Sequence, residues 1–179
     1  PEDTALDSIC SCRPSPNSVR AALRALPRPP FAVFLTSPDY LGFLADIQGI
    51  VTAVDACCGA GSVPVLVDNA HGAYLHFLET PLHPMDQGAY LCCDSAHKTL
   101  PVLTGGAYLH FSAEAAAEVG ASARRTMELF ASTSPSYLIL QSLDLCNAYL
   151  ADNYSARLYA CIRRIEGLSY YLRTLGAEL

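Results

Sequence analysis

The sequence predicts an α/β fold: a mainly parallel β-sheet flanked by helices in three layers. Continuous apolar runs of strand length alternate with segments of helical periodicity along most of the chain. A continuous apolar run, such as 31–36 before Ser37-Pro38, is typical of a strand buried on both faces of a parallel sheet. With 179 residues, 51% hydrophobic and 16% charged, the chain is long enough for one domain with a sizeable core.

The expected strands are four apolar runs, over 31–36, 63–67, 89–93 and 107–111. We expect the first two to be buried on both faces. The expected helices are the periodic segments 17–26, 46–57, 113–130 and 137–175, the last interrupted near Asn153 or Gly167. Asn17 or Ser18 is the expected N-cap of the first helix. Gly59-Ala60-Gly61 follows a helix and lacks the third glycine of a dinucleotide-binding turn, so we interpret it as a helix stop.

Charge and hydropathy exclude two classes of partner. The formal net charge is -6 and the arginines form no basic stripe, which argues against nucleic-acid binding. The apolar runs are too short and too interrupted for a membrane span or a signal peptide. We therefore expect neither nucleic acid nor membrane as a partner.

The eight cysteines do not suggest a disulfide framework. Cys57-Cys58 and Cys92-Cys93 are vicinal pairs, and Cys146 and Cys161 fall in helical patterns. We interpret them as buried, reduced thiols, which predicts a cytoplasmic protein. CxxC and HxxxH spacings are absent, so the sequence predicts no zinc site.

Lys98 is the only lysine of the chain, in the stretch Ser95-Ala96-His97-Lys98-Thr99. A primary amine can lose its proton and attack a carbonyl carbon, whereas an arginine side chain stays charged. Lys98 is therefore a candidate Schiff-base residue. An ordinary surface lysine is an equally good interpretation of this residue taken alone.

Polar side chains follow two of the expected strands, where ligands bind in open parallel sheets. Asp68 and His71 follow one strand, and Ser95, His97 and Lys98 follow another. An amine, a carboxylate, a hydroxyl and imidazoles match the needs of pyridoxal 5'-phosphate: an anchor for its aldehyde, a partner for its pyridine nitrogen and donors for its phosphate.

Four motifs carry a specific resemblance. They are Thr36-Ser37-Pro38-Asp39-Tyr40, Val65-Leu66-Val67-Asp68-Asn69-Ala70-His71-Gly72-Ala73, Ser95-Ala96-His97-Lys98-Thr99-Leu100-Pro101 and Ser132-Thr133-Ser134-Pro135-Ser136-Tyr137. In this order they resemble the major domain of the Orn/Lys/Arg decarboxylase family, fold-type-I enzymes that depend on pyridoxal phosphate. The resemblance implies a large domain of the pyridoxal-phosphate-dependent transferase type.

The resemblance implies roles for individual residues. Lys98 would form the internal aldimine, and Asp68 would pair with the pyridinium nitrogen. Ser95 and His97 would contact the cofactor phosphate.

Four further positions receive roles in the same way. Ala70 and His71 would pack beside or over the cofactor ring. Ser132, with Thr133 as a neighbour, would reach the phosphate of a cofactor bound by the partner subunit. This implies a homodimer or a higher homo-oligomer with shared active sites.

The implied activity is decarboxylation of a basic amino acid (arginine, lysine or ornithine) to an amine or polyamine precursor. Two alternatives stay open: another fold-type-I activity, such as an aminotransferase or lyase, and a truncated, non-catalytic homologue. The chain begins at Pro1 without methionine, which predicts a fragment: 1–16 an irregular leader and 17–179 a partial, incomplete major domain.

Some residues have other interpretations, and the chain departs from the family pattern at two places. Taken without its neighbours, Asp68 could be the N-cap of a following helix. Ser134 before Pro135 is a pattern typical of the first residues of a helix. Asn69 stands where the family has a glutamate, with little effect expected on the cofactor. Gly105-Gly106 stands where the family has a glutamine and a small polar residue. The remaining histidines are expected at core edges or on the surface: His76, His83 and His110.

Overall fold

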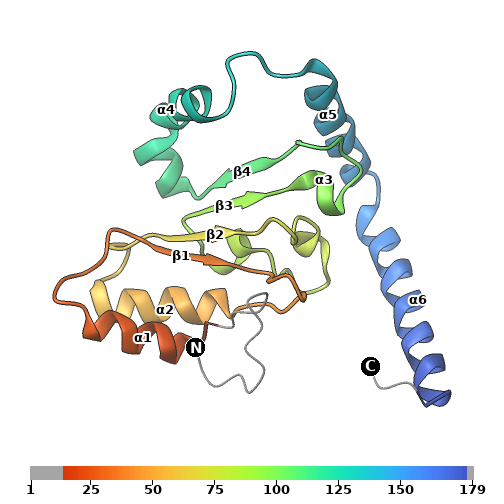
Figure 1. Cartoon of the computed structure of the whole chain (residues 1–179), viewed down its shortest axis with the longest axis horizontal. Helices are drawn as coiled ribbons and strands as arrows, with labels where there is room; N and C mark the ends of the chain where they lie inside the picture. The colour runs from red at the N-terminus through yellow and green to blue at the C-terminus, as the bar shows by residue number, and fades with distance from the viewer. Residues whose placement is uncertain (1–13, 177–179) are drawn as a thin grey trace.

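A computed structural model of the chain describes residues 14–176. Its four strands form one sheet in the order β1-β2-β3-β4: β1 (Val33–Thr36), β2 (Val65–Asp68), β3 (Leu91–Asp94) and β4 (Tyr108–Phe111) (Figure 1). β1, β2 and β3 are parallel, and β4 runs antiparallel to β3. The expected α/β class and the mainly parallel sheet are confirmed.

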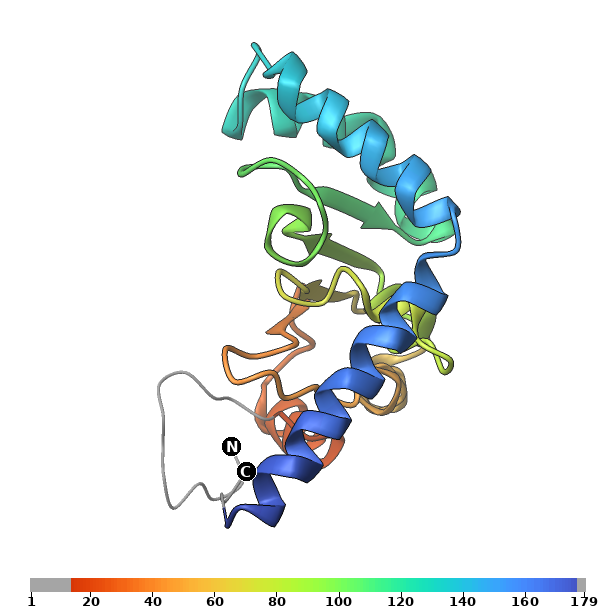
Figure 2. The same ribbon diagram turned by 90° about the vertical axis from the view of Figure 1, so that its right-hand side faces the viewer.

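The helices and 3-10 turns in the described range are α1 (Pro16–Ala25), α2 (Ile47–Cys58), η1 (Leu75–Phe77), η2 (Pro84–Gln87), α3 (Ala96–Thr99), α4 (Ala113–Phe130), α5 (Tyr137–Ala151) and α6 (Tyr154–Thr174). α1 and α2 lie together near β1, whereas α4 and α5 lie at the β4 end of the sheet (Figures 1 and 2). α6 follows α5 and descends along the right-hand side of Figure 1 to the level of α1 and α2, from which it stays separate in that view. None of the helices within residues 14–176 is long and apolar enough to cross a membrane.

Local capping chemistry sets the helix ends. Ser15, rather than Asn17 or Ser18, is the N-cap of α1: its hydroxyl accepts from the Ser18 N–H, and the Ser18 hydroxyl accepts from the Ser15 N–H. The expected interruption of the last helix lies at Asn153, whose positive φ of 57° separates α5 from α6.

The sheet has one covered and one open face, because successive side chains of a strand point to opposite sides. On the covered face, strand residues pack against α2 in a core of Leu35, Ile47, Ile50, Val54, Val63, Val65, Val67, Ala89 and Cys92. On the open face Phe34 is 69% exposed. The expectation that both faces of the first strand are buried is therefore wrong, since the described residues leave this part of the sheet uncovered. A third layer over Phe34 stays a prediction.

A second apolar cluster holds α3 in place. Ala73, Ala96, Leu100 and Cys146 are buried together and join α3 to α5. The Tyr108 hydroxyl donates to the Leu143 carbonyl at 3.1 Å, which fastens β4 to the same helix. The short helix that carries Lys98 is thus supported from behind by α5.

The cysteine interpretation holds only in part. Cys92 and Cys146 are buried and free, as expected of small apolar side chains. Cys93 and Cys161 are exposed, contrary to the expectation. Cys93 is exposed because it points to the open face of β3.

Ile50, which is fully buried in the α2 core, tests this packing scheme. Ile50→Ala should lower the free energy of unfolding by about 2–5 kcal/mol, through lost burial and the cavity left behind. The same change at Ile165, which is 58% exposed on α6, should cost about 0.5 kcal/mol or less. Urea denaturation followed by circular dichroism measures both, and equal losses would contradict the assigned core.

Candidate active site

The strands β2 and β3 deliver the predicted site residues to one end of the sheet. Both strands are parallel, and Asp68 at the end of β2 is the register partner of Cys93 in β3. Asp68 and Cys93 share the open face, whereas Asn69 and Asp94, one residue further along, are buried. Alternation along the strands therefore separates two carboxylates, Asp68 and Asp94, onto opposite faces.

Asp68 is held by the turn that follows it. Its Oδ1 accepts a hydrogen bond of 3.0 Å from the Ala70 N–H. A helix does not begin here, since the next helical turn is η1 at Leu75, so the helix-cap interpretation of Asp68 is wrong. The half-buried carboxylate keeps its second oxygen for other contacts.

Lys98 and His71 are brought into contact. The Lys98 Nζ lies 3.2 Å from the His71 Nε2, although the two residues are on different segments of the chain. The Tyr40 ring packs edge-on against the His71 ring, with centroids 5.4 Å apart. Since Lys98 is exposed on α3, the amine is accessible and oriented by His71 at the carboxyl end of β3.

Ser95 and His97 frame the start of α3. Ser95 is the N-cap residue, but its hydroxyl makes no capping bond and stays available. The His97 Nδ1–H donates to the Gly106 carbonyl at 3.0 Å, which fixes the ring. Gly106 is required by close packing, because a Cβ there would lie 2.3 Å from Val102 Cγ1. The Gly105-Gly106 departure thus serves the loop that holds His97.

Ser132 and Thr133 lie apart from these contacts, exposed in the connection between α4 and α5. The Ser132 hydroxyl accepts from the Ser134 N–H at 3.0 Å. α5 begins at Tyr137 with Ser136 at its N-cap, so the expected helix start at Ser134 is wrong. The role of Ser132 toward a partner subunit stays a prediction.

On the covered face a buried carboxylate gathers two histidines. Asp94 is 2% exposed, and its Oδ2 lies 3.0 Å from His83 Nε2 and 2.9 Å from His110 Nε2. Its Oδ1 accepts from the Asn69 Nδ2 at 2.7 Å. Burial alone raises the pKa of Asp94, but the hydrogen bonds from His110, His83 and Asn69 outweigh it and hold this pKa well below its ordinary value.

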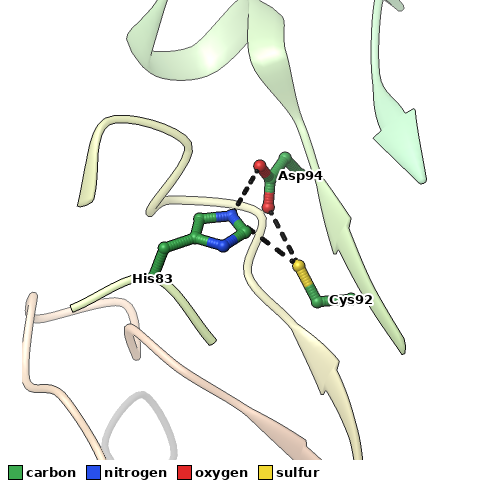
Figure 3. Close-up of side chains that lie close together, drawn as sticks. All are labelled: His83, Cys92 and Asp94. Carbon is green, nitrogen blue, oxygen red and sulfur yellow. Dashed lines mark hydrogen bonds and ion pairs between the residues drawn. The ribbon is translucent and has the colours of Figure 1, made fainter. Parts of the chain in front are cut away.

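The Cys92 thiol completes this group of side chains. Its Sγ lies 3.5 Å from Asp94 Oδ1 and 3.8 Å from His83 Nε2, and Figure 3 shows the three side chains turned toward one another. Burial, followed by the charge of Asp94, raises the pKa of the Cys92 thiol. The imidazole, thiol and carboxylate lie close enough to hold a metal ion.

This cluster was not predicted from the sequence. His83 and His110 were expected at core edges or on the surface, and no zinc site was expected because the usual spacings are absent. His83 is in fact buried, and His110 reaches Asp94 because β4 pairs antiparallel with β3, with Cys92 opposite His110. The one signal in the sequence was Asp94 itself: a carboxylate ending a buried strand requires buried donors.

Comparison with known proteins identifies the family. The family described as "Orn/Lys/Arg decarboxylase, major domain" matches residues 5–173. The chain belongs to the Orn/Lys/Arg decarboxylase family.

Similar proteins occur in bacilli. The chain is 37% identical over 153 residues to the "Uncharacterized protein YaaO" of Bacillus subtilis (strain 168), covering 84% of this chain and 31% of that protein. It is 36% and 34% identical to proteins named "Arginine decarboxylase" of Halalkalibacterium halodurans and Bacillus subtilis, covering 76% and 75% of this chain. The chain spans 27% of each of these two decarboxylases.

The residues at the carboxyl ends of β2 and β3 fit pyridoxal phosphate by their chemistry. Lys98 offers an accessible amine, Asp68 a carboxylate with an uncommitted oxygen, and Ser95 a hydroxyl that makes no capping bond. The covered-face cluster around Asp94 has no amine and does not fit this cofactor. The two faces of the sheet therefore differ in the chemistry they can support.

Asp94→Asn tests the buried cluster. It should lower the free energy of unfolding by about 3 kcal/mol at neutral pH in EDTA-containing buffer, because it breaks a buried charge network. Asp86→Asn removes the matched exposed pair, in which His76 Nδ1 lies 2.8 Å from Asp86, and should cost less than about 1 kcal/mol. Urea denaturation measures both.

The stabilising effect of Asp94 should also depend on pH, which a comparison of wild type with Asp94→Asn tests. An aspartate of the unfolded chain has a pKa of about 3.9, and the pKa of Asp94 in the folded protein lies below this. Its stabilising effect is therefore fully present above that pH and is lost as the pH falls toward the folded pKa. The stability gap between wild type and Asp94→Asn should narrow below about pH 4; a constant gap would contradict the lowered pKa.

Proposed function

We propose that the protein decarboxylates a basic amino acid (arginine, lysine or ornithine) with pyridoxal 5'-phosphate as cofactor. The observation that carries this proposal is the contact between the lone lysine and His71 at the carboxyl ends of β2 and β3, where Asp68 also lies. Membership of the Orn/Lys/Arg decarboxylase family supports the same conclusion, as do relatives named arginine decarboxylase.

Each residue has a separate task in this proposal. Lys98 holds the cofactor aldehyde, and Asp68 faces the pyridine nitrogen. Ser95 and His97 bind the phosphate, beside the N-terminus of α3. When bound, the cofactor supplies an electron sink for the pair left after loss of carbon dioxide.

Ala70 and His71 form the wall of the site. The Ala70 N–H fixes one oxygen of Asp68, which leaves the other for the cofactor nitrogen. His71 Nε2 holds the Lys98 amine at 3.2 Å and is placed to exchange a proton with it. Tyr40 limits the movement of the His71 ring.

The proposal also includes a homo-oligomer with shared active sites and a cytoplasmic location. Ser132 is assigned to the phosphate of a site in a second copy of the chain, in a homodimer or a larger homo-oligomer. The exposed position of Ser132, away from the other site residues, is compatible with contact to another subunit. Free thiols at all described cysteines agree with a cytoplasmic protein.

Labelling of Lys98 tests cofactor binding. Incubation with pyridoxal phosphate followed by borohydride should attach one pyridoxyl group to Lys98, read by mass spectrometry after digestion. Because Lys98 is the only lysine, the chain amino terminus is the one competing amine. Lys98→Arg keeps the positive charge but should abolish the label, since a guanidinium stays protonated. Label on the amino terminus alone would contradict the assignment.

Asp68→Ala tests the electron-sink role. The variant should keep the Lys98 label but release carbon dioxide from arginine, lysine or ornithine at least about 100-fold more slowly. Asp144→Ala, an exposed aspartate of α5, is the control and should act like wild type. An oxo acid in place of carbon dioxide would identify an aminotransferase, and wild-type protein with neither label nor product would identify a non-catalytic homologue.

A further inference from the structure

The covered face of the sheet gathers four side chains of the types that bind zinc. His83, Cys92 and Asp94 are buried, and each offers one ligand atom, all within 4.8 Å of one another. His110 lies outside this mutually close group, but its Nε2 lies 2.9 Å from the same Asp94 oxygen that His83 approaches, which makes it the candidate fourth ligand. Two imidazoles, a thiol and a carboxylate form a mixed donor set for a borderline divalent cation.

The separations of both histidines from Asp94, and of Cys92 from His83, are close to those of a tetrahedral site. Zinc bonds of about 2.0 Å to nitrogen or oxygen and about 2.3 Å to sulfur place two N/O ligands about 3.3 Å apart, and sulfur about 3.6 Å from either. The observed values are 3.0 and 2.9 Å for the two histidine–carboxylate pairs. Cys92 Sγ lies 3.8 Å from His83 Nε2 and 3.5 Å from Asp94 Oδ1, the carboxylate oxygen that the histidines do not contact. His83, Cys92 and Asp94 are already close enough to share an ion, and a shift of His110 together with a turn of the Asp94 carboxylate would bring in the fourth ligand.

The surroundings supply an entry path and an outer shell. A cavity of about 340 Å³ is lined by His83, Asp94 and His110, so an ion can reach the cluster from solvent. Asn69 donates to Asp94 Oδ1 at 2.7 Å, which orients the carboxylate with Oδ2 toward the histidines. Such outer-shell bonds are typical of metal sites.

The geometry points to a structural zinc-type site formed by His83, Cys92, Asp94 and His110. In the metal-free protein the Met85 N–H donates to His83 Nδ1 at 3.3 Å, which places the ring proton on Nε2. A cation bound at Nε2 requires the other neutral tautomer: the Nε2 proton leaves to solvent and Nδ1 takes one up, so Nδ1 no longer accepts from the Met85 N–H and this long hydrogen bond is lost. The cation also stabilises the Cys92 thiolate, which the metal-free site disfavours.

The ion would join three segments: β3 with Cys92 and Asp94, β4 with His110, and the start of η2 with His83. β3 leads directly from Asp94 into the α3 segment that carries Lys98. The site therefore lies behind the candidate active site, on the opposite face, and fixes the end of the strand that positions the lysine. Its role is structural, and it is independent of pyridoxal phosphate.

Binding of Zn²⁺ and Co²⁺ to the purified chain without pyridoxal phosphate tests the site. The expected result is one equivalent of metal per chain. The Co²⁺ form should show intense visible bands of tetrahedral geometry and an ultraviolet thiolate-to-cobalt band. Cys92→Ser should lose the thiolate band, and His110→Gln should keep it; each should weaken Zn²⁺ binding at least about tenfold.

Cys93→Ala is the matched control, because Cys93 neighbours Cys92 in β3 but is exposed on the open face. It should bind metal like wild type. Circular dichroism of the metal-free variants separates lost binding from lost folding, and His110, with 37% side-chain exposure, is the site residue that tolerates replacement best. Weak octahedral Co²⁺ spectra, or a thiolate band lost in Cys93→Ala and kept in Cys92→Ser, would overturn the proposal. Neither result would bear on labelling of Lys98.

Discussion

One buried carboxylate ties together the part of the fold on which the site depends. Asp94 ends β3, lies next to Asn69 after β2, and contacts His83 before η2 and His110 in β4. A buried charge is tolerated only when donors surround it, and here three side chains provide them. Because these donors come from separate segments, satisfying one charge fixes the relative positions of the strand ends. The backbone at Asp94 is therefore held in place, and so is the start of the α3 segment that follows it and carries Lys98.

Strand alternation divides the chemistry between two faces. Asp68 and Cys93 face the open side, whereas Asn69 and Asp94 face the covered side. The open face offers the half-buried carboxylate of Asp68, and the exposed amine of Lys98 lies on α3 beyond the end of β3; both suit a cofactor that must exchange substrate with solvent. The polar side chains on the covered face are buried and hydrogen-bonded to one another, which suits a role in stabilising the fold. Two aspartates near each other in the fold thus have different environments and different proposed roles.

The sequence was sufficient where local chemistry decides the outcome. The helix over Ala113–Phe130 and the break at Asn153 follow from periodicity and a residue that tolerates positive φ. Lys98 and His71 were predicted through motif order, and the structure places them in contact. The cluster of His83 and His110 around Asp94 could not be predicted, because it requires the antiparallel register of β4 on β3. The exposure of Phe34 likewise depends on what covers the sheet, which strand composition does not contain.

Asn69, which stands where the resembling family has a glutamate, is explained by its contact with the buried Asp94. Its position follows Asp68, but its side chain points to the other face, where Nδ2 donates to Asp94 at 2.7 Å. A glutamate here would set a second carboxylate against Asp94, and like charges in a buried site repel strongly. An amide instead supplies a donor, so Asn69 and Asp94 form a compatible pair. The Asn69 Oδ1, buried without a partner, is the cost of this arrangement. The substitution therefore belongs to the network behind the sheet, and the carboxylate of Asp68 on the open face is left unchanged by it.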